Sequence, residues 1–396
     1  MVKLIVFLVI VFASLIGGVS LLVNGIRWII KSSRNEECFR IINVFKGNII
    51  FLAGIIILMT IYICITQITA HTTDIKDSDG KTVSGSIAEL KKVNLNGHDE
   101  WISIRGRNKE APVLLFLAGG PGGTQMAATR YSLSQLEDNF VVVNWDQPGS
   151  GKSYNCMKRS DITPETYVKD GIALTEYLKD RFGQEKIYLM GESWGSALGI
   201  FIISEKPEYY AGFIGTGQMV DFAGTERLDY KKAMEIAEEK GDTKTLQKLA
   251  SEGEPPYYDG NISLRSATYL NYLLSYMEAN PEITNGGFHT FRDMFSSEYG
   301  IVDSINYLRG IINTFNVVYP QLYETDLRKD YAKLHVPVYF FLGRHDVNAP
   351  TSLSEEYYKV LDAPQKKLVW FEHSGHNPWI SESDLFVKET LKAFRK

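Results

Sequence analysis

The sequence predicts an α/β protein: a mostly parallel, doubly wound sheet that carries a helical cap insertion and is preceded by two transmembrane helices. Three observations lead to this class. The first 70 residues contain two long, uncharged apolar runs. From about residue 89, short apolar runs alternate with helical stretches, which is typical of a parallel sheet covered by helices on both faces. Residues 219–328 break this alternation with helical patterns alone.

The N-terminal segment, residues 1–70, is predicted to be a two-span membrane anchor. Residues 4–23 and 48–68 are uncharged and strongly apolar, and each has about the 20 residues that a helix needs to cross the hydrocarbon core. A cleaved signal peptide explains the first run less well, because its apolar part is too long and no small-residue cleavage site follows it. A buried core helix explains the second run less well, because the run is apolar on all faces.

The basic residues predict how this anchor is oriented. Five of them lie in or beside the loop between the two apolar runs: Arg27, Lys31, Arg34, Arg40 and Lys46. The positive-inside rule places such a loop in the cytoplasm. Both chain ends, and with them the large C-terminal domain, are then expected outside the cytoplasm, at the cell membrane. Residues 71–88 are polar and contain Gly and Ser, which is typical of a tether.

Short apolar runs after residue 88 are predicted to be the strands of the sheet. They cover residues 113–117, 140–145, 187–190, 212–215, 336–342 and 367–371. Runs that are apolar throughout suit strands buried on both faces. An antiparallel hairpin is expected ahead of them, at Asn96-Gly97. The sheet domain therefore comprises residues 89–218 and 329–396.

The insertion at residues 219–328 is predicted to be a helical cap. Its predicted helices cover residues 231–239, 242–251, 264–278 and 301–315. The sheet pattern resumes at Val336. A cap over an active site therefore explains the insertion better than an independent domain does.

Charge and cysteine content exclude several classes of function. Residues 1–70 carry six Lys and Arg against two Asp and Glu, a net charge of +4, so the total of −5 leaves −9 for the rest. An acidic body does not suit nucleic-acid binding. Only Cys156 lies beyond residue 70, so the main domain has no internal disulfide. No Cys and His cluster has the spacing of a zinc site, and we expect neither a metal nor a cofactor.

A nucleophile motif follows one of the predicted strands. Gly191-Glu192-Ser193-Trp194-Gly195 comes directly after the run at residues 187–190 and precedes a helical stretch at residues 198–204. A nucleophile elbow requires this context, because the two glycines permit a sharp turn that raises the serine hydroxyl above the sheet. We therefore predict that Ser193 is the nucleophile of a serine hydrolase.

A serine nucleophile needs a base and an acid that orients the base. For elbows of this type the order along the chain is Ser, acid, His. His376 lies in the loop after the last predicted strand, where the base is expected, and Asp346 follows the strand before it. Asp346 would hold His376 in the correct tautomer and stabilise its protonated form. The nearby His373 is interpreted as a packing residue.

Backbone N–H groups must stabilise the oxyanion of the tetrahedral intermediate. One is expected from Trp194, directly after the serine. The others are expected from Gly119 and Gly120, in the glycine-rich run at residues 118–123. Such runs also bind phosphate, but the G-x-x-x-x-G-K-[ST] pattern of phosphate-binding loops is absent from the sequence.

These motifs resemble those of the proline iminopeptidase family of α/β-hydrolases. The resemblance rests on Gly119-Gly120-Pro121-Gly122, on residues 146–153, on the elbow at Ser193 and on the late pair Asp346 and His376. It covers about residues 90–396 and does not include the N-terminal anchor. It implies an α/β-hydrolase fold with a helical cap, a metal-free triad, and the release of N-terminal residues, typically proline, from peptides.

Two positions depart from the family pattern. Ala118 stands where family members usually have His, and Pro148 where they usually have Arg. Both lie close to the expected pocket, so they bear on substrate preference and leave the triad intact. The family also uses cap carboxylates to hold the free amino group of the substrate. The resemblance implies this role for cap carboxylates of this chain, and the candidates are Glu226, Glu235 and Glu278.

The sequence therefore predicts a membrane-anchored serine hydrolase that acts as an aminopeptidase on short peptides through an acyl-enzyme. The alternative is an esterase or amidase of the same fold with a small non-peptide acyl substrate. Acid groups in the cap would favour the peptidase, and a wholly apolar cavity would favour the esterase. A non-catalytic binding protein is disfavoured, because all three triad residues are kept. An epoxide hydrolase or dehalogenase would need Asp in place of Ser193.

Overall fold

Residues 2–284 and 287–394 are described by a computed structural model, in which the chain divides into two units. The smaller unit comprises the N-terminal segment up to His71 and the short segment Phe295–Ser304. The larger unit comprises the rest of the chain and carries the residues expected to be catalytic.

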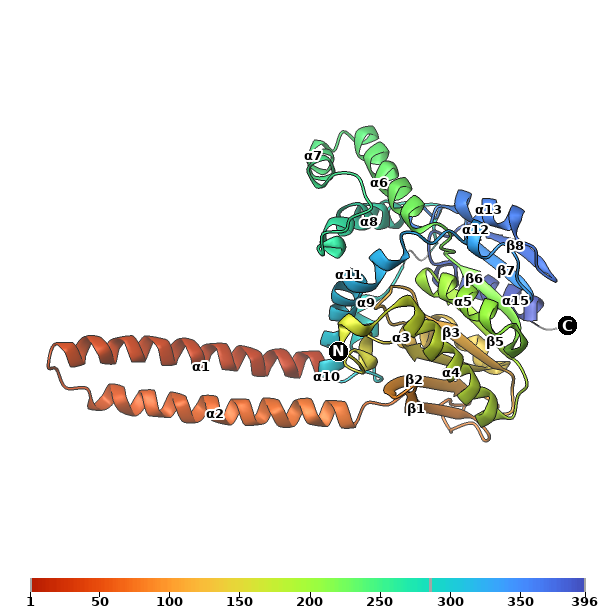
Figure 1. Ribbon diagram of the computed structural model, residues 1–396. Coiled ribbons are helices and arrows are strands. Elements are labelled where there is room, and N and C mark those ends of the chain that lie inside the picture. The colour runs from red at the N-terminus through yellow and green to blue at the C-terminus, as the bar shows by residue number, and fades with distance from the viewer. Residues whose placement is uncertain (1, 285–286, 395–396) are drawn as a thin grey trace. The chain divides into compact units, whose positions relative to one another are not determined.

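An eight-stranded sheet forms the centre of the larger unit (Figure 1). Its strand order is β1-β2-β4-β3-β5-β6-β7-β8. Only the β1–β2 and β2–β4 pairs of this sheet are antiparallel. The strands are β1 (Ile87–Leu95), β2 (His98–Gly106), β3 (Val113–Leu117), β4 (Val141–Asp146), β5 (Ile187–Glu192), β6 (Tyr210–Thr216), β7 (Val338–Gly343) and β8 (Lys366–Phe371). The prediction of a mostly parallel α/β sheet is confirmed.

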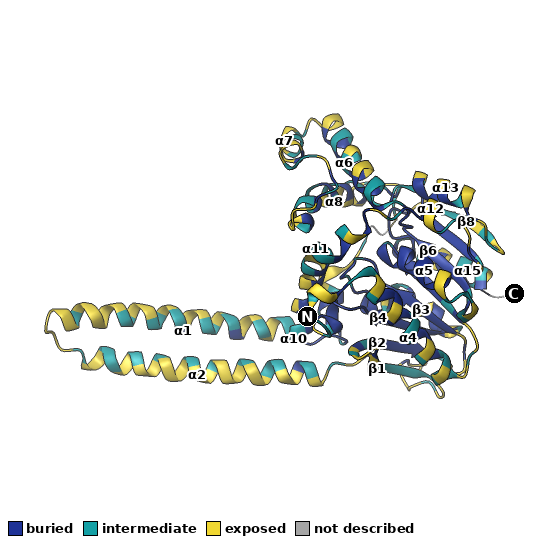
Figure 2. Ribbon diagram, in the orientation of Figure 1, coloured by how far each residue is buried: buried dark blue, intermediate teal, exposed yellow. Residues whose placement is uncertain are grey.

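The central parallel strands are buried on both faces, whereas β8 at the edge is only partly buried. In β3, Leu114 and Phe116 belong to one cluster of buried side chains, whereas Val113, Leu115 and Leu117 belong to another. Successive residues of a strand point to opposite faces, so a separate core lies on each side of the sheet. Figure 2 shows the central strands as continuously buried.

Helices complete both of these cores. α4 (Pro164–Phe182), α5 (Trp194–Glu205) and α13 (Thr351–Val360) contribute to the core that contains Leu115, and α3 (Met126–Ser132), α14 (Pro378–Ser381) and α15 (Ser383–Phe394) to the other. α4 begins at the N-cap Thr163, whose Oγ1 accepts a hydrogen bond from Thr166 N at 3.2 Å. The layers therefore alternate as helix, sheet and helix.

The segment between β6 and β7 is helical. It contains α6 (Phe222–Glu239), α7 (Thr243–Glu252), α8 (Ile262–Glu278), α9 (Thr290–Met294), α10 (Ile301–Arg309), α11 (Phe315–Val318) and α12 (Leu327–Asp330). The single helix expected at residues 301–315 is interrupted, because a π-helical turn at Gly310–Thr314 separates α10 from α11. At this turn a Cβ on Gly310 would lie 2.3 Å from the carbonyl oxygen of Gly122. This close contact with the glycine-rich loop explains the change in helical geometry.

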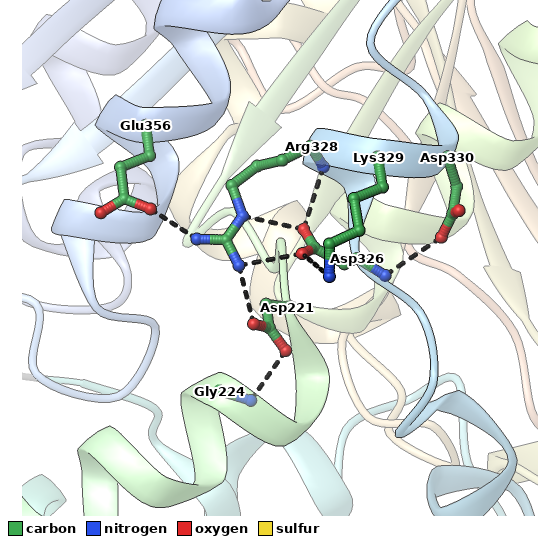
Figure 3. Close-up of polar contacts among 7 residues, drawn as sticks. All are labelled: Asp221, Gly224, Asp326, Arg328, Lys329, Asp330 and Glu356. Carbon is green, nitrogen blue, oxygen red and sulfur yellow. Dashed lines mark hydrogen bonds and ion pairs between the residues drawn. The ribbon is translucent and has the colours of Figure 1, made fainter.

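An ion network at Arg328 joins the two chain segments that enter and leave this helical region (Figure 3). Arg328 donates from Nη2 to Asp221 Oδ2 and from Nε to Asp326 Oδ1, both at 2.8 Å. Asp221 also caps α6, since its Oδ1 accepts from Gly224 N at 2.8 Å. The guanidinium pairs as well with Glu356 of α13. Both ends of the helical insertion are thereby tied to the sheet domain.

The segment expected to be a tether is partly packed onto the sheet domain. Thr72 and Ile75 are buried. The buried Arg105 of β2 donates from Nη1 to Thr72 Oγ1 at 2.8 Å and forms a 2.7 Å ion pair with Glu137. A buried guanidinium needs acceptors for its N–H groups, so the start of this segment is ordered where a free linker was expected.

Two long helices make up most of the smaller unit: α1 (Val2–Ser33) and α2 (Phe39–Ile68). Both are long and apolar enough to cross a membrane. Their apolar side chains are largely exposed (Figure 2). The helices approach closely at Gly17, where a Cβ would lie 2.8 Å from a methyl carbon of Leu52. Asn48 Nδ2 of α2 also donates to Ser20 Oγ of α1 at 3.0 Å, so a polar contact links these two apolar helices.

The short segment Phe295–Ser304 belongs to this smaller unit through polar contacts. Lys3 Nζ donates to two of its carbonyl oxygens, at 2.6 and 2.7 Å. Gln67 Nε2 donates to Asp303 Oδ1 at 3.0 Å. Residues near the start of α1 and the end of α2 therefore hold the segment.

Candidate active site

Ser193 stands at a sharp turn between β5 and α5. Its φ of 53° and ψ of −122° are values that residues with side chains rarely adopt. The flanking glycines are needed because the backbone passes too close for a side chain. A Cβ on Gly191 would lie 2.1 Å from the carbonyl oxygen of Gly195, and one on Gly195 would lie 2.1 Å from that of Leu117. This is the local geometry of a nucleophile elbow.

His376 and Asp346 lie in the loops that follow β8 and β7. His376 Nδ1 is 2.9 Å from Asp346 Oδ2, and both side chains are buried. The other oxygen of Asp346 accepts from the N–H groups of Asn348 and Ala349 at 2.8 and 2.9 Å. These bonds fix the carboxylate, which in turn fixes the ring and its tautomer.

The other ring nitrogen of His376 faces the elbow. Nε2 lies 3.4 Å from Oε1 of Glu192, the residue directly before Ser193. Across residues 2–284 and 287–394, no hydrogen bond between Ser193 and His376 is formed. The hydrogen bond between a nucleophile and its base is often long until the substrate binds. The structure therefore places His376 beside the turn that carries Ser193, although the two side chains are not hydrogen-bonded.

The glycine loop after β3 adjoins the same turn. A Cβ on Gly119 would lie 3.2 Å from Cβ of Ser193. The backbone N–H groups of Gly120 and Trp194 donate to no acceptor within the described part of the chain. N–H groups beside a serine nucleophile and free of internal acceptors are what an oxyanion requires.

A small acidic recess reaches Ser193 from the cap. Its volume is about 100 Å³, and its lining includes Ser193, Gly120, Glu226 and Asp229. The two carboxylates are three residues apart on α6, which places them on one face of the helix. Both side chains are almost completely buried, at 1% exposure each. The recess thus holds two acid groups close to the nucleophile.

The two carboxylates differ in their partners. Glu226 accepts hydrogen bonds from the Tyr269 hydroxyl and, at 3.2 Å, from Ser266 Oγ. Both oxygens of Asp229 have no hydrogen-bond partner among the described residues. A buried group without a partner costs about 1–3 kcal/mol, and such groups often mark the place of a ligand.

Burial also changes how these acids ionise. Burial raises the pKa of Glu226 to about 7, although hydrogen bonds from Tyr269, Tyr319 and Ser266 lower it. Burial raises the pKa of Asp229 well above its usual range, and the Glu226 and Asp346 carboxylates raise that pKa further. A bound cation would favour the ionised form of both acids.

A larger cavity of about 240 Å³ also reaches Ser193. Its walls include Glu192 and three side chains from the helical insertion, Phe288, Tyr307 and Ile311. These three side chains are largely apolar, so this cavity suits an apolar part of a substrate. The site therefore has one acidic and one mostly apolar compartment.

The three cap carboxylates predicted from the sequence line three different cavities. Glu226 lies in the recess with Ser193. Glu235 is half-exposed, pairs with Lys232 at 3.4 Å, and lines a different cavity. Glu278 lines a cavity that reaches His376. His373, expected to be a packing residue, contacts the backbone of the insertion through Nδ1.

Two residues of the site were missed by the sequence analysis. Glu192 lies inside the serine motif, but nothing in the motif shows where its side chain points. Asp229 follows Glu226 by three residues, and this spacing on a predicted helix is a signal that could have found it. In the described part of the chain, no group of three or more His, Cys, Asp or Glu side chains is placed to hold a metal ion.

Comparison with known proteins decides the family. A family model described as "Serine aminopeptidase, S33" matches residues 126–266. A probable aminopeptidase of Bacillus subtilis (strain 168), YbaC, is 31% identical over 312 residues, which cover 76% of this chain and 95% of the relative. The chain belongs to the proline iminopeptidase-like S33 family of α/β-hydrolases. It is therefore a serine hydrolase.

Two further similar proteins support the assignment of this chain to the S33 family. A proline iminopeptidase of Saccharolobus solfataricus is 26% identical over 303 residues, which cover 76% of this chain and 89% of the relative. The crystal structure of a proline iminopeptidase-related protein from Thermus thermophilus matches with a TM-score of 0.52 at 20% identity, over 78% of this chain and 98% of that one. At this identity the structural match shows the shared α/β-hydrolase fold.

Proposed function

We propose that this S33 hydrolase is a membrane-anchored aminopeptidase that releases N-terminal residues from short peptides through an acyl-enzyme on Ser193. The observation that carries the proposal is Asp229, a buried acid without a partner among the described residues, in a recess that reaches Ser193. The N-terminus of a peptide is a compact cation, and buried charges need partners of opposite sign. The names of the relatives, a probable aminopeptidase and a proline iminopeptidase, support the same class.

The proposed reaction uses the arrangement around the elbow. Ser193 Oγ attacks the carbonyl carbon of the first residue while His376 Nε2 takes its proton, and Asp346 stabilises the resulting imidazolium. The N–H groups of Gly120 and Trp194 hold the oxyanion. His376 then gives the proton to the leaving amine, and the acyl-enzyme forms. Water activated by the same histidine releases the residue and restores the serine.

The recess also explains why cleavage would be restricted to the chain end. Glu226 and Asp229 share a cavity of about 100 Å³ with the nucleophile, so a bound ammonium group lies only a short distance from the attacked carbonyl. A peptide bond in the middle of a chain has no ammonium group at that distance. An internal bond would bring no cation to Asp229, so it would lack the ion pair that favours binding of a chain end.

A matched substrate pair tests this proposal on the wild-type enzyme. Alanine and proline p-nitroanilides should be hydrolysed, and their N-acetyl derivatives should have a kcat/KM lower by at least about 10², because the charge that pairs with the recess is removed. Comparable rates for the free and N-acetyl anilides would contradict the aminopeptidase. Turnover of short acyl esters alone, without either anilide, would favour the esterase alternative.

The membrane anchor is the second part of the proposal. Helices α1 and α2 are each long and apolar enough to span a bilayer, and basic residues gather in the loop between them. We expect the full chain to stay in the membrane pellet after extraction with alkaline carbonate. Protease added to intact cells should degrade the hydrolase unit. Release into the supernatant would contradict the anchor, and protection of the unit until lysis would contradict its orientation.

A further inference from the structure

Glu192 is a buried carboxylate at the elbow that the proposed reaction does not use. It is the last residue of β5, and its side chain is only 3% exposed. Oε2 accepts a hydrogen bond from Gln125 Nε2 at 2.7 Å, and the backbone N–H of Gly119 faces the same carboxylate. These contacts hold the group in one position. Its other oxygen, Oε1, is left 3.4 Å from Nε2 of His376.

His376 therefore lies between two carboxylates from different parts of the sheet. Asp346, after β7, is 2.9 Å from Nδ1, and Glu192, at the end of β5, is 3.4 Å from Nε2. From the cap, Glu278 of α8 lines a cavity that also reaches the histidine. The Glu192 contact differs from the Asp346 contact in its position, because Glu192 faces Nε2, the nitrogen that must exchange the proton with Ser193.

We infer that Glu192 is a positioning residue that stabilises the imidazolium form of His376 at Nε2, as Asp346 does at Nδ1. This inference rests on the proposed acyl-enzyme reaction. As the bond from Ser193 Oγ to the carbonyl carbon forms, the hydroxyl proton moves to Nε2, and the new positive charge faces the Glu192 carboxylate. The leaving amine then takes the proton, and the ring is neutral again. The contact is strong because water is excluded from both groups.

The same contact contributes, after Asp346, to the pH at which His376 can act as a base. Burial lowers the pKa of His376, but the Asp346 and Glu192 carboxylates raise it more, to about 9. The base must be unprotonated to accept the proton of Ser193. Removal of the Glu192 charge lowers the pKa of the ring and also makes the imidazolium in the transition state less stable. Glu192→Gln should therefore react at about the wild-type rate in acid, where these two effects offset each other, and more slowly than the wild type in alkali.

The rate at which a fluorophosphonate labels Ser193 tests the inference. The second-order rate constant is measured on the full chain in detergent, from about pH 5 to about pH 10. One pH unit corresponds to a tenfold change in an equilibrium. We expect Glu192→Gln to move the midpoint of the acid limb down by about one pH unit and to lower the alkaline plateau about tenfold. The matched control is Glu282→Gln, which removes a carboxylate 3.4 Å from Nε2 of His345 and should leave the profile unchanged.

An unchanged midpoint in Glu192→Gln would overturn the inference, because a purely structural loss lowers the rate at every pH alike. Labelling reports activation of the nucleophile whatever the natural substrate is, so this outcome is distinct from a failure of the aminopeptidase proposal. If Glu192→Gln does not fold, NMR titration of His376 in the wild-type chain decides. A ring that titrates at or below its ordinary value of about 6.5 would equally overturn the inference.

Discussion

Replacement of Ser193 by alanine should lower kcat by about 10⁵-fold or more and abolish labelling by a fluorophosphonate. The expected loss is this large because no acyl-enzyme can form without the hydroxyl, and a triad acts as a unit. The remaining activity should come only from substrate binding and from the N–H groups of Gly120 and Trp194. Steady-state kinetics with an aminoacyl anilide and gel-based labelling measure the two effects separately.

A matched control is available on α5, the helix that follows Ser193. Ser204 lies near the end of α5 and is exposed, so Ser204→Ala should retain wild-type labelling and turnover. Ser193→Ala should also fold normally, because the strained turn is kept by the flanking glycines. Labelling that persists in Ser193→Ala would show that another residue is the nucleophile, and the proposed reaction would fail.

Much of the sheet could be predicted because a strand that is buried on both faces appears in the sequence as a continuous apolar run. In β3, all five residues are apolar and fully buried, so the run at residues 113–117 stands out without any alignment. The turn at Ser193 was equally visible, because Gly191 and Gly195 occupy positions where a Cβ would collide with the backbone. Such constraints act locally, and local constraints can be read from neighbouring residues.

The helical region was predicted less well because its details depend on distant contacts. The expected helix at residues 301–315 is broken where Gly310 meets Gly122, far away in the sequence. A helical pattern gives no sign of such a neighbour. The packing of the supposed tether onto β2 likewise depends on Arg105, whose need for acceptors appears only once it is buried.

The acid groups of the site also depend on distant contacts, which the sequence alone does not show. Glu226 was one of three equivalent candidates in the sequence, because helix charges are most often solvated. Only the fold shows that it is buried beside Ser193, that Asp229 joins it without a partner among the described residues, and that Glu192 lies 3.4 Å from His376. Sequence order predicted which residue types take part in the chemistry, and tertiary packing selects among the acids.

The proposal that the recess holds the substrate's ammonium group also predicts the effect of Asp229→Asn. This change keeps the shape of the side chain and removes the charge, so kcat/KM for an aminoacyl p-nitroanilide should fall by about 10²–10³. The fold should not suffer, because a buried unpaired carboxyl is itself unfavourable, and thermal unfolding should occur at or above the wild-type temperature. Fluorophosphonate labelling should stay close to the wild-type rate, since the reagent carries no ammonium group.

The most direct test of the account is therefore the ratio of kcat/KM for an aminoacyl p-nitroanilide to that for its N-acetyl derivative, measured in Asp229→Asn and in Glu235→Gln. Both residues lie on α6, but only Asp229 lines the recess with Ser193. We expect Asp229→Asn to lower the ratio by at least about 10² and Glu235→Gln to change it less than about twofold. An unchanged ratio in Asp229→Asn, or an equal fall in both variants, would contradict the assignment of this recess to the peptide N-terminus.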